Sequence, residues 1–124
     1  MKLKELHYSK NERIETRVHD VISYIFSKHS NPKIYLSEIE ATGKLGNELK
    51  QRVRQKDRLL VTSDVILKLF KESGQILEGV IEIVPEKKGH PIVIDLKGGM
   101  YVDIYENNLV IPNEVLGEHS IVEY

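Results

Sequence analysis

The chain has no cysteine and no tryptophan, and its only aromatic residues are six tyrosines and two phenylalanines. The absence of cysteine excludes disulfides, thiolate metal sites and cysteine nucleophiles. With so few aromatic residues, the core has to be built from Ile, Leu and Val. No stretch approaches the roughly 18 consecutive apolar residues that cross a bilayer, and the N-terminal segment lacks the apolar run of a signal peptide. We therefore expect a soluble, cytoplasmic protein without a membrane partner.

Motifs for catalysis and cofactor binding are also missing. The five histidines include no pair at i, i+4 and no HExxH sequence, and there is no GxSxG, GxxxxGK[ST] or GxGxxG. His19 and His29 are ten residues apart on a predicted helix, which is too far for one metal ion, so we interpret both as surface or half-buried residues. The sequence therefore predicts a protein that is not an enzyme and has no metal and no cofactor.

The composition is that of a folded protein, because 40% of the 124 residues are hydrophobic and 30% are charged. The net charge is −1 but is unevenly distributed. Residues 1–75 hold 15 Lys/Arg and 10 Asp/Glu, whereas residues 76–124 hold 3 and 9. This asymmetry indicates a polyanionic partner for the basic half. The alternatives are that the two halves attract each other or that the charge is simply solvated.

Helical periodicity dominates the first 74 residues. The stripe Ile14, Val18, Val21, Ile22, Ile25 and Phe26 predicts a helix over about 10–29. Ser9 and Glu12 match a capping box at its start, and Asn31-Pro32 ends it.

A short extended piece at 33–36 precedes three further predicted elements. Ser37 and Gly43 bound a second helix, and residues 44–58 form a third, although alternating basic residues make a strand the rival interpretation for 50–58. A short strand at 59–61 follows. Ser63 or Asp64 then caps a fourth helix, which Gly74 ends.

From Gln75 the hydrophobic period changes to two. Short segments at 76–84, 91–96, 100–105, 109–111 and 120–123 are separated by turn sequences, and a single helical turn is expected at 112–117. We therefore predict an α+β fold with a helical, basic part at 1–74 and an antiparallel β-meander at 75–124, folding as one cooperative unit. Asp95 and Asp103 fall on neighbouring strands, where facing carboxylates would raise one pKa, but we interpret them as solvent-facing acids.

The main candidate for function is the basic segment 44–58, whose net charge is +4. Its predicted buried edge is Leu45, Leu49 and Val53, so the opposite face presents amides and arginines. Arginine reads guanine and Asn or Gln reads adenine, while flanking cations neutralise phosphates. DNA contact and a solvated or protein-facing surface both remain open. The predicted DNA-binding residues are Lys44, Asn47, Lys50, Gln51, Arg52, Arg54, Gln55, Lys56, Arg58, Lys87 and Lys88.

The order of elements over about residues 10–90 resembles that of winged helix-turn-helix DNA-binding proteins. In that family the second helix of a pair enters the major groove and a hairpin wing touches the backbone. The resemblance implies that residues 44–58 form the recognition helix and that Lys87 and Lys88 lie near phosphate. The sequence departs from the family at 42–46, which lacks the usual apolar spacing. Separately, the rhythm of short segments at 75–124 resembles a small SH3-like barrel.

Two functions follow from these observations. The first is a small DNA-binding regulatory or accessory protein that contacts duplex DNA. A bias to Ile, Lys and Glu suits a low-GC genome, such as that of a phage or plasmid. The second is a non-catalytic protein-interaction module or inhibitor that uses its acidic β half. A homodimer is compatible with either function.

Overall fold

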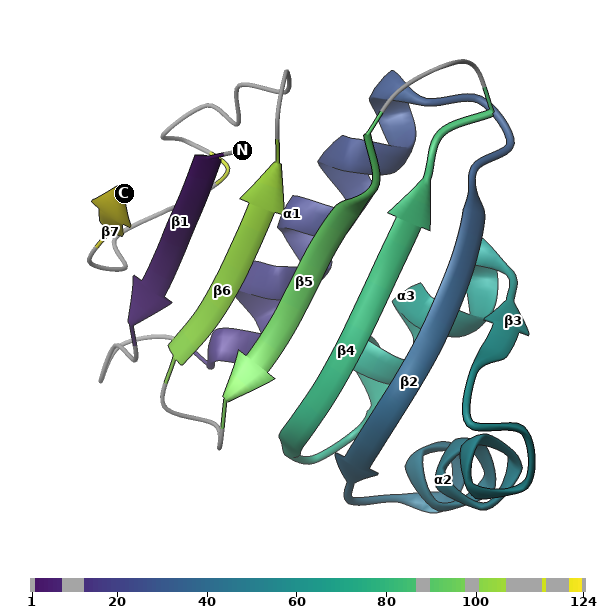
Figure 1. Cartoon of the computed structure of the whole chain (residues 1–124). Coiled ribbons are helices and arrows are strands. Elements are labelled where there is room, and N and C mark those ends of the chain that lie inside the picture. The colour runs from purple at the N-terminus through teal and green to yellow at the C-terminus, as the bar shows by residue number, and fades with distance from the viewer. Residues whose placement is uncertain are drawn as a thin grey trace.

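A seven-stranded antiparallel sheet forms the frame of the molecule, in the order β3-β2-β4-β5-β6-β1-β7 (Figure 1). The computed structural model describes residues 2–7, 13–86, 90–97, 101–106, 115 and 121–123. The strands are β1 (Lys2–His7), β2 (Lys33–Ala41), β3 (Leu59–Val61), β4 (Ile76–Val84), β5 (Ile92–Lys97), β6 (Tyr101–Glu106) and β7 (Ile121–Glu123). The helices are α1 (Ile14–Lys28), α2 (Lys44–Lys56) and α3 (Ser63–Glu72).

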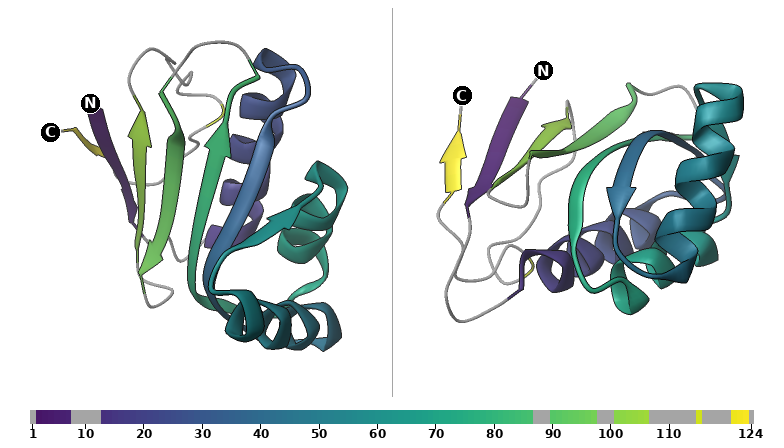
Figure 2. Two further views of the ribbon diagram at one scale, coloured as in Figure 1. Left: turned by 45° about the vertical axis from the view of Figure 1, so that its right-hand side comes forward. Right: turned by 90° about the horizontal axis from the view of Figure 1, so that it is seen from below.

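Helices α1 and α3 pack on one face of the sheet, and α2 lies across the end of the sheet at which β2 finishes (Figure 2). The core lies between the sheet and the two packed helices. Alternate strand residues point into it, as expected for a sheet with one covered face. Val21, Ile22 and Ile25 of α1 are 0% exposed, which confirms the predicted apolar stripe of the first helix. The capping box at Ser9 and Glu12 lies outside the described residues.

The helix predicted between Ser37 and Gly43 is wrong, because these residues continue β2 to Ala41. The register of β2 against β4 shifts between Ser37 and Ile39, and Glu38 has a φ of 52°. A bulge adds one residue to a strand and disrupts its alternation. The buried residues Ile34, Leu36 and Ile39 are therefore not evenly spaced, and the pattern is not recognisable as period two.

The part predicted as mainly helical, residues 1–74, contains more strand than expected. The extended piece predicted at 33–36 and the short strand predicted at 59–61 lie in β2 and β3, but β1 and the second half of β2 were not predicted. The cap of α3 is Thr62, whose side-chain oxygen accepts a hydrogen bond from the N–H of Val65, and not Ser63 or Asp64. The helix ends at Glu72, two residues before Gly74.

The antiparallel meander is confirmed, because β4 pairs with β5 and β5 with β6. These strands continue into one open sheet, in which β4 also pairs with β2 and β6 with β1. The two ends of the chain thus contribute to the same sheet. The strand predicted at 109–111 and the helical turn at 112–117 lie outside the described residues, apart from Val115, which is helical and packs against the core.

Candidate nucleic-acid interface

Helix α2 is attached to the rest of the protein by a narrow apolar edge. Leu49 and Val53 are 1% and 7% exposed, and Leu45 is half-buried, as the sequence predicts. Gly46 lies against Ala41 at the end of β2, where a Cβ on the glycine would come within 2.8 Å of the Ala41 Cβ and 2.9 Å of its carbonyl oxygen. The absence of a side chain at position 46 therefore allows the helix to approach β2 closely.

Backbone geometry sets the two ends of α2. Gly43 has a φ of 95°, a conformation that only glycine adopts without strain, and its carbonyl oxygen accepts a hydrogen bond from the N–H of Asn47 at 3.1 Å. At the other end, Asp57 has a φ of 60° and donates its N–H to the carbonyl oxygen of Val53. Aspartate is among the non-glycine residues that are enriched at positive φ. Gly43 therefore begins α2, and the prediction that it ends a preceding helix is wrong.

The exposed face of α2 has three rows of side chains, since residues four apart lie above one another on a helix. The middle row, opposite the buried edge, holds the amides Asn47, Gln51 and Gln55, all exposed. The row on one side contains Lys50 and Arg54. The row on the other side is Glu48, Arg52 and Lys56. The helix therefore presents a line of amides with cations on both sides.

Two of the predicted DNA-binding residues are engaged within the protein. The Nζ of Lys50 lies 2.6 Å from Oε2 and 2.8 Å from Oε1 of Glu40 on β2. Arg58 pairs with Glu82 on β4, and its guanidinium stacks 3.6 Å from the ring centroid of Tyr35 on β2. Their acidic partners lie on other elements, 10 and 24 residues away in the chain, so the periodicity of α2 could not have indicated these pairs.

The other predicted residues of α2 point to solvent. The four cations among them are exposed and form no ion pair within the described part of the chain: Lys44, Arg52, Arg54 and Lys56. Lys87 and Lys88 lie outside the described residues. The helix predicted to precede α2 is part of β2, so the pair of helices on which the helix-turn-helix resemblance depends is not formed at 37–58.

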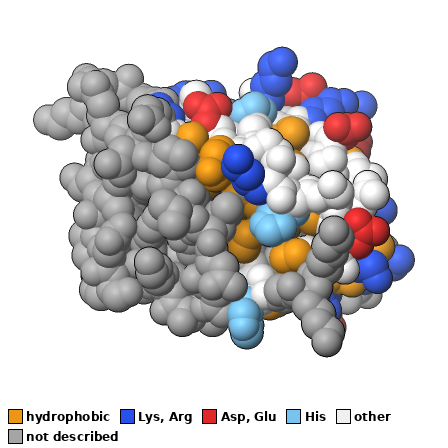
Figure 3. Space-filling view, turned by 90° about the horizontal axis from the view of Figure 1, so that it is seen from above, with side chains coloured by type: hydrophobic (Ala, Val, Ile, Leu, Met, Phe, Trp, Pro, Cys, Tyr) orange, Lys and Arg blue, Asp and Glu red, His pale blue; other side chains and the backbone are white. Residues whose placement is uncertain are grey.

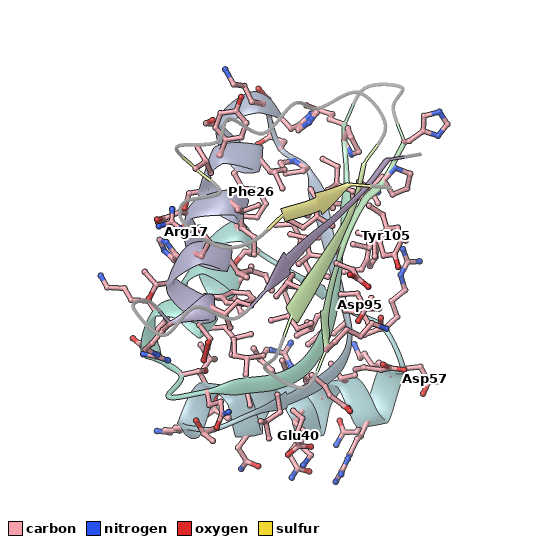
Figure 4. All side chains as sticks on the ribbon, turned by 90° about the vertical axis from the view of Figure 1, so that its left-hand side faces the viewer. Arg17, Phe26, Glu40, Asp57, Asp95 and Tyr105 are labelled. Atoms are coloured by element: carbon pink, nitrogen blue, oxygen red, sulfur yellow. The ribbon has the colours of Figure 1, made fainter. Side chains whose placement is uncertain are left out.

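The sheet face opposite α1 carries Asp95 and Tyr105 (Figure 4). Asp95 and Asp103 do face each other across β5 and β6. Asp95 is ion-paired at 2.8 Å with Lys97, but Asp103 is only 7% exposed, so its interpretation as a solvent-facing acid is wrong. Burial and the charge of Asp103 raise the pKa of Tyr105. The hydrogen bond and charge of Asp95 raise the pKa of Lys97.

Histidines and acidic side chains were also candidates for metal binding. Among the described residues, no group of three or more His, Asp or Glu side chains is arranged to hold a metal ion. His19 and His29 are half-buried, as expected. No helix in the described part of the chain is long and apolar enough to cross a membrane.

Comparison with known proteins does not extend the argument. No protein family, curated protein or solved structure significantly matches this chain. The functional assignment therefore rests on the residues and geometry of α2.

Proposed function

We propose that this protein binds duplex DNA through the exposed face of α2, as a small regulatory or accessory protein. The observation that supports the proposal is the row of Asn47, Gln51 and Gln55 between two rows that contain unpaired cations. A helix of 13 residues is about 20 Å long, and the major groove of B-DNA, about 12 Å wide, admits one helix.

In this arrangement the two kinds of side chain have different tasks. Amides of Asn and Gln form bidentate hydrogen bonds with adenine, and Arg54 beside them is placed to reach guanine. Arg52 and Lys56 on one flank and Lys44 at the N-terminal end are placed to neutralise phosphates. Phosphate contacts release counterions, so affinity has to fall steeply with salt concentration.

The test is fluorescence anisotropy with labelled duplexes over a series of salt concentrations, after selection of a preferred site from random sequences. Arg54→Ala should cost about 1–3 kcal/mol on the preferred site and relax sequence choice. Lys56→Ala should weaken binding to all sequences alike and lower the salt slope by about one. Lys28→Ala is the matched control, because Lys28 lies in the last turn of α1, at the end of the molecule away from α2 (Figure 1).

Two results would contradict the proposal in different ways. If the wild-type protein shows no salt-dependent binding to any duplex at micromolar concentration, α2 is a solvated or protein-facing surface. If Arg54→Ala and Lys56→Ala have identical effects on every sequence, α2 binds DNA without reading its sequence.

A further inference from the structure

A groove lies beside strand β3, near the start of β2, whereas α2 lies near the end of β2 (Figure 1). The groove combines an edge strand of the sheet with an apolar wall. Strand β3 occupies one end of the strand order, and no strand flanks it on the side away from β2 in the described part of the chain. Leu60 in the middle of β3 is 58% exposed, and among the described residues it is the one large hydrophobic side chain that is exposed to solvent. Its neighbours in the strand, Leu59 and Val61, are buried or half-buried, so Leu60 necessarily points to the other face.

Next to this edge lies a groove of about 800 Å³. The end of α1, the segment that leads into β2, and the residues between β3 and α3 form its walls. Seen from above, hydrophobic side chains lie beside histidine and lysine or arginine side chains on this face of the molecule (Figure 3). The residues that line the groove include Phe26, His29, Pro32, Lys33, Leu60 and Val61.

The groove carries a positive charge, which comes from Lys33. This side chain is exposed and forms no ion pair within the described residues, and none of the residues that line the groove is acidic. The nearby acid Asp64, in the first turn of α3, is not part of the lining. An apolar groove with an uncompensated cation favours a ligand that is apolar and negatively charged.

We propose that the β3 edge and this groove bind an extended acidic segment of a partner protein, which adds to the sheet as a further strand. In such strand addition, main-chain hydrogen bonds supply affinity, and pockets for alternate side chains supply specificity. Leu60 and Lys33 lie on one face of the sheet, and Val61 and Phe26 lie on the other. Apolar side chains on one face of the segment therefore pack on Phe26 and Val61, and the carboxylates on its other face lie beside Leu60 and near Lys33. The short β3, with three residues, offers few main-chain hydrogen bonds, so the groove has to supply much of the contact.

The proposal is tested on the full-length protein by NMR with two blocked peptides of opposite charge. The probe is acetyl-Glu-Leu-Glu-Leu-Glu-amide, and the control is acetyl-Lys-Leu-Lys-Leu-Lys-amide, which has the same alternation. The acidic peptide should shift the amide resonances of residues 29–33 and 59–63 and slow hydrogen exchange at β3. The basic peptide should leave these resonances unchanged.

Three variants define the contacts. Leu60→Asp and Lys33→Glu should each weaken binding of the acidic peptide about tenfold or more, because the first places a repulsive charge beside the carboxylates of the peptide and the second reverses the attracting charge. Both residues are exposed, so neither change should unfold the protein. Lys68→Glu on the solvent side of α3 is the matched control and should leave the affinity unchanged.

The proposal is overturned if the acidic peptide causes no shifts at millimolar concentration, if both peptides shift the same residues equally, or if Lys68→Glu weakens binding as much as Lys33→Glu. Shifts confined to residues 44–56 would also overturn it, because they would show that the acidic peptide occupies the basic helix instead. This proposal and DNA binding by α2 stand or fall separately, since they use different residues.

Discussion

The ammonium group of Lys50 on α2 lies 2.6 Å from a carboxylate oxygen of Glu40 on β2, and this ion pair joins the basic helix to the sheet. Lys50 is 23% exposed and Glu40 is 44% exposed at the side chain, so the pair is open to solvent and contributes little to stability. Its effect is to neutralise one cation of the proposed DNA-binding face.

Replacement of Glu40 by Gln should therefore strengthen DNA binding. The substitution removes the charge that compensates Lys50, which then becomes available to a phosphate, so the salt slope should rise by up to about one. Salt-dependent anisotropy with a single duplex measures this change. Glu72→Gln on α3, which removes an exposed carboxylate next to Lys68, is the control. An unchanged slope in Glu40→Gln would mean that Lys50 does not reach the DNA backbone.

Substitution of Gly46 by Ala should destabilise the protein by about 1–3 kcal/mol, as overpacking does. The new Cβ would meet both the side chain and the backbone of Ala41, so α2 has to move away from β2. Urea unfolding measures the loss. Asn47→Ala at the next, exposed position should change stability by no more than about 0.5 kcal/mol. If Gly46→Ala is as stable as Asn47→Ala, α2 is free to shift on the sheet.

Replacement of Ile22 by Ala should cost about 2–5 kcal/mol, because the side chain is 0% exposed and the surrounding core would be left with a cavity. The free energy of unfolding in urea again provides the measurement. Thr16→Ala, on the exposed side of the same helix, is the control, because it introduces alanine into α1 without removing a buried side chain. A loss of less than about 0.5 kcal/mol in Ile22→Ala would mean that the apolar stripe of α1 is a binding or dimer surface.

Stability should fall at alkaline pH through Tyr105 and Lys97. Burial raises the pKa of Tyr105 above its ordinary value of 10.0, and the charge of Asp103 adds to this. The pKa of Lys97 is also raised, above 10.5, chiefly by its hydrogen bond to Asp95. Because the folded state binds these protons more tightly than the unfolded chain, their contribution is complete below the unfolded pKa values and is lost as pH rises through the folded ones.

Unfolding in urea at a series of alkaline pH values, together with NMR titration of the Tyr105 ring, tests this prediction. Asp103→Asn should lower the pKa of Tyr105 only partly, since burial is the larger cause. Asp64→Asn, an exposed substitution on α3, should leave it unchanged. A Tyr105 ring that titrates at or below pH 10 in the wild-type protein would contradict the assignment.

Residues 75–124 should not fold as stably alone as they do in the whole chain. In the full protein β4 lies between β2 and β5, β6 lies between β5 and β1, and β7 pairs with β1. The isolated fragment would therefore lose a neighbour from three of its strands, β4, β6 and β7, and the cover of α1 and α3. Circular dichroism during thermal unfolding of the separately expressed fragment measures this. A cooperative transition as stable as that of the full chain would show two independent units.

The sequence by itself determined the elements whose signals are local. The stripe of α1, the apolar edge of α2, the position of β3 and the period-two strands β4 to β6 could all be predicted, because side-chain periodicity reports directly on which face of an element is buried. The amide and cation rows of α2 follow from the same periodicity.

Only the tertiary structure decided how these elements meet. The second half of β2 was predicted as a helix. The bulge at Glu38 adds a residue to the strand and so breaks the alternation by which strands are recognised. The pairing of β1 with β6 and of β2 with β4 joins residues far apart in the chain. These long-range pairs decide which cations are neutralised, that Asp103 is buried, and that no strand in the described part of the chain flanks β3 on the side away from β2. They depend on which strands become neighbours and not on the pattern within any one strand.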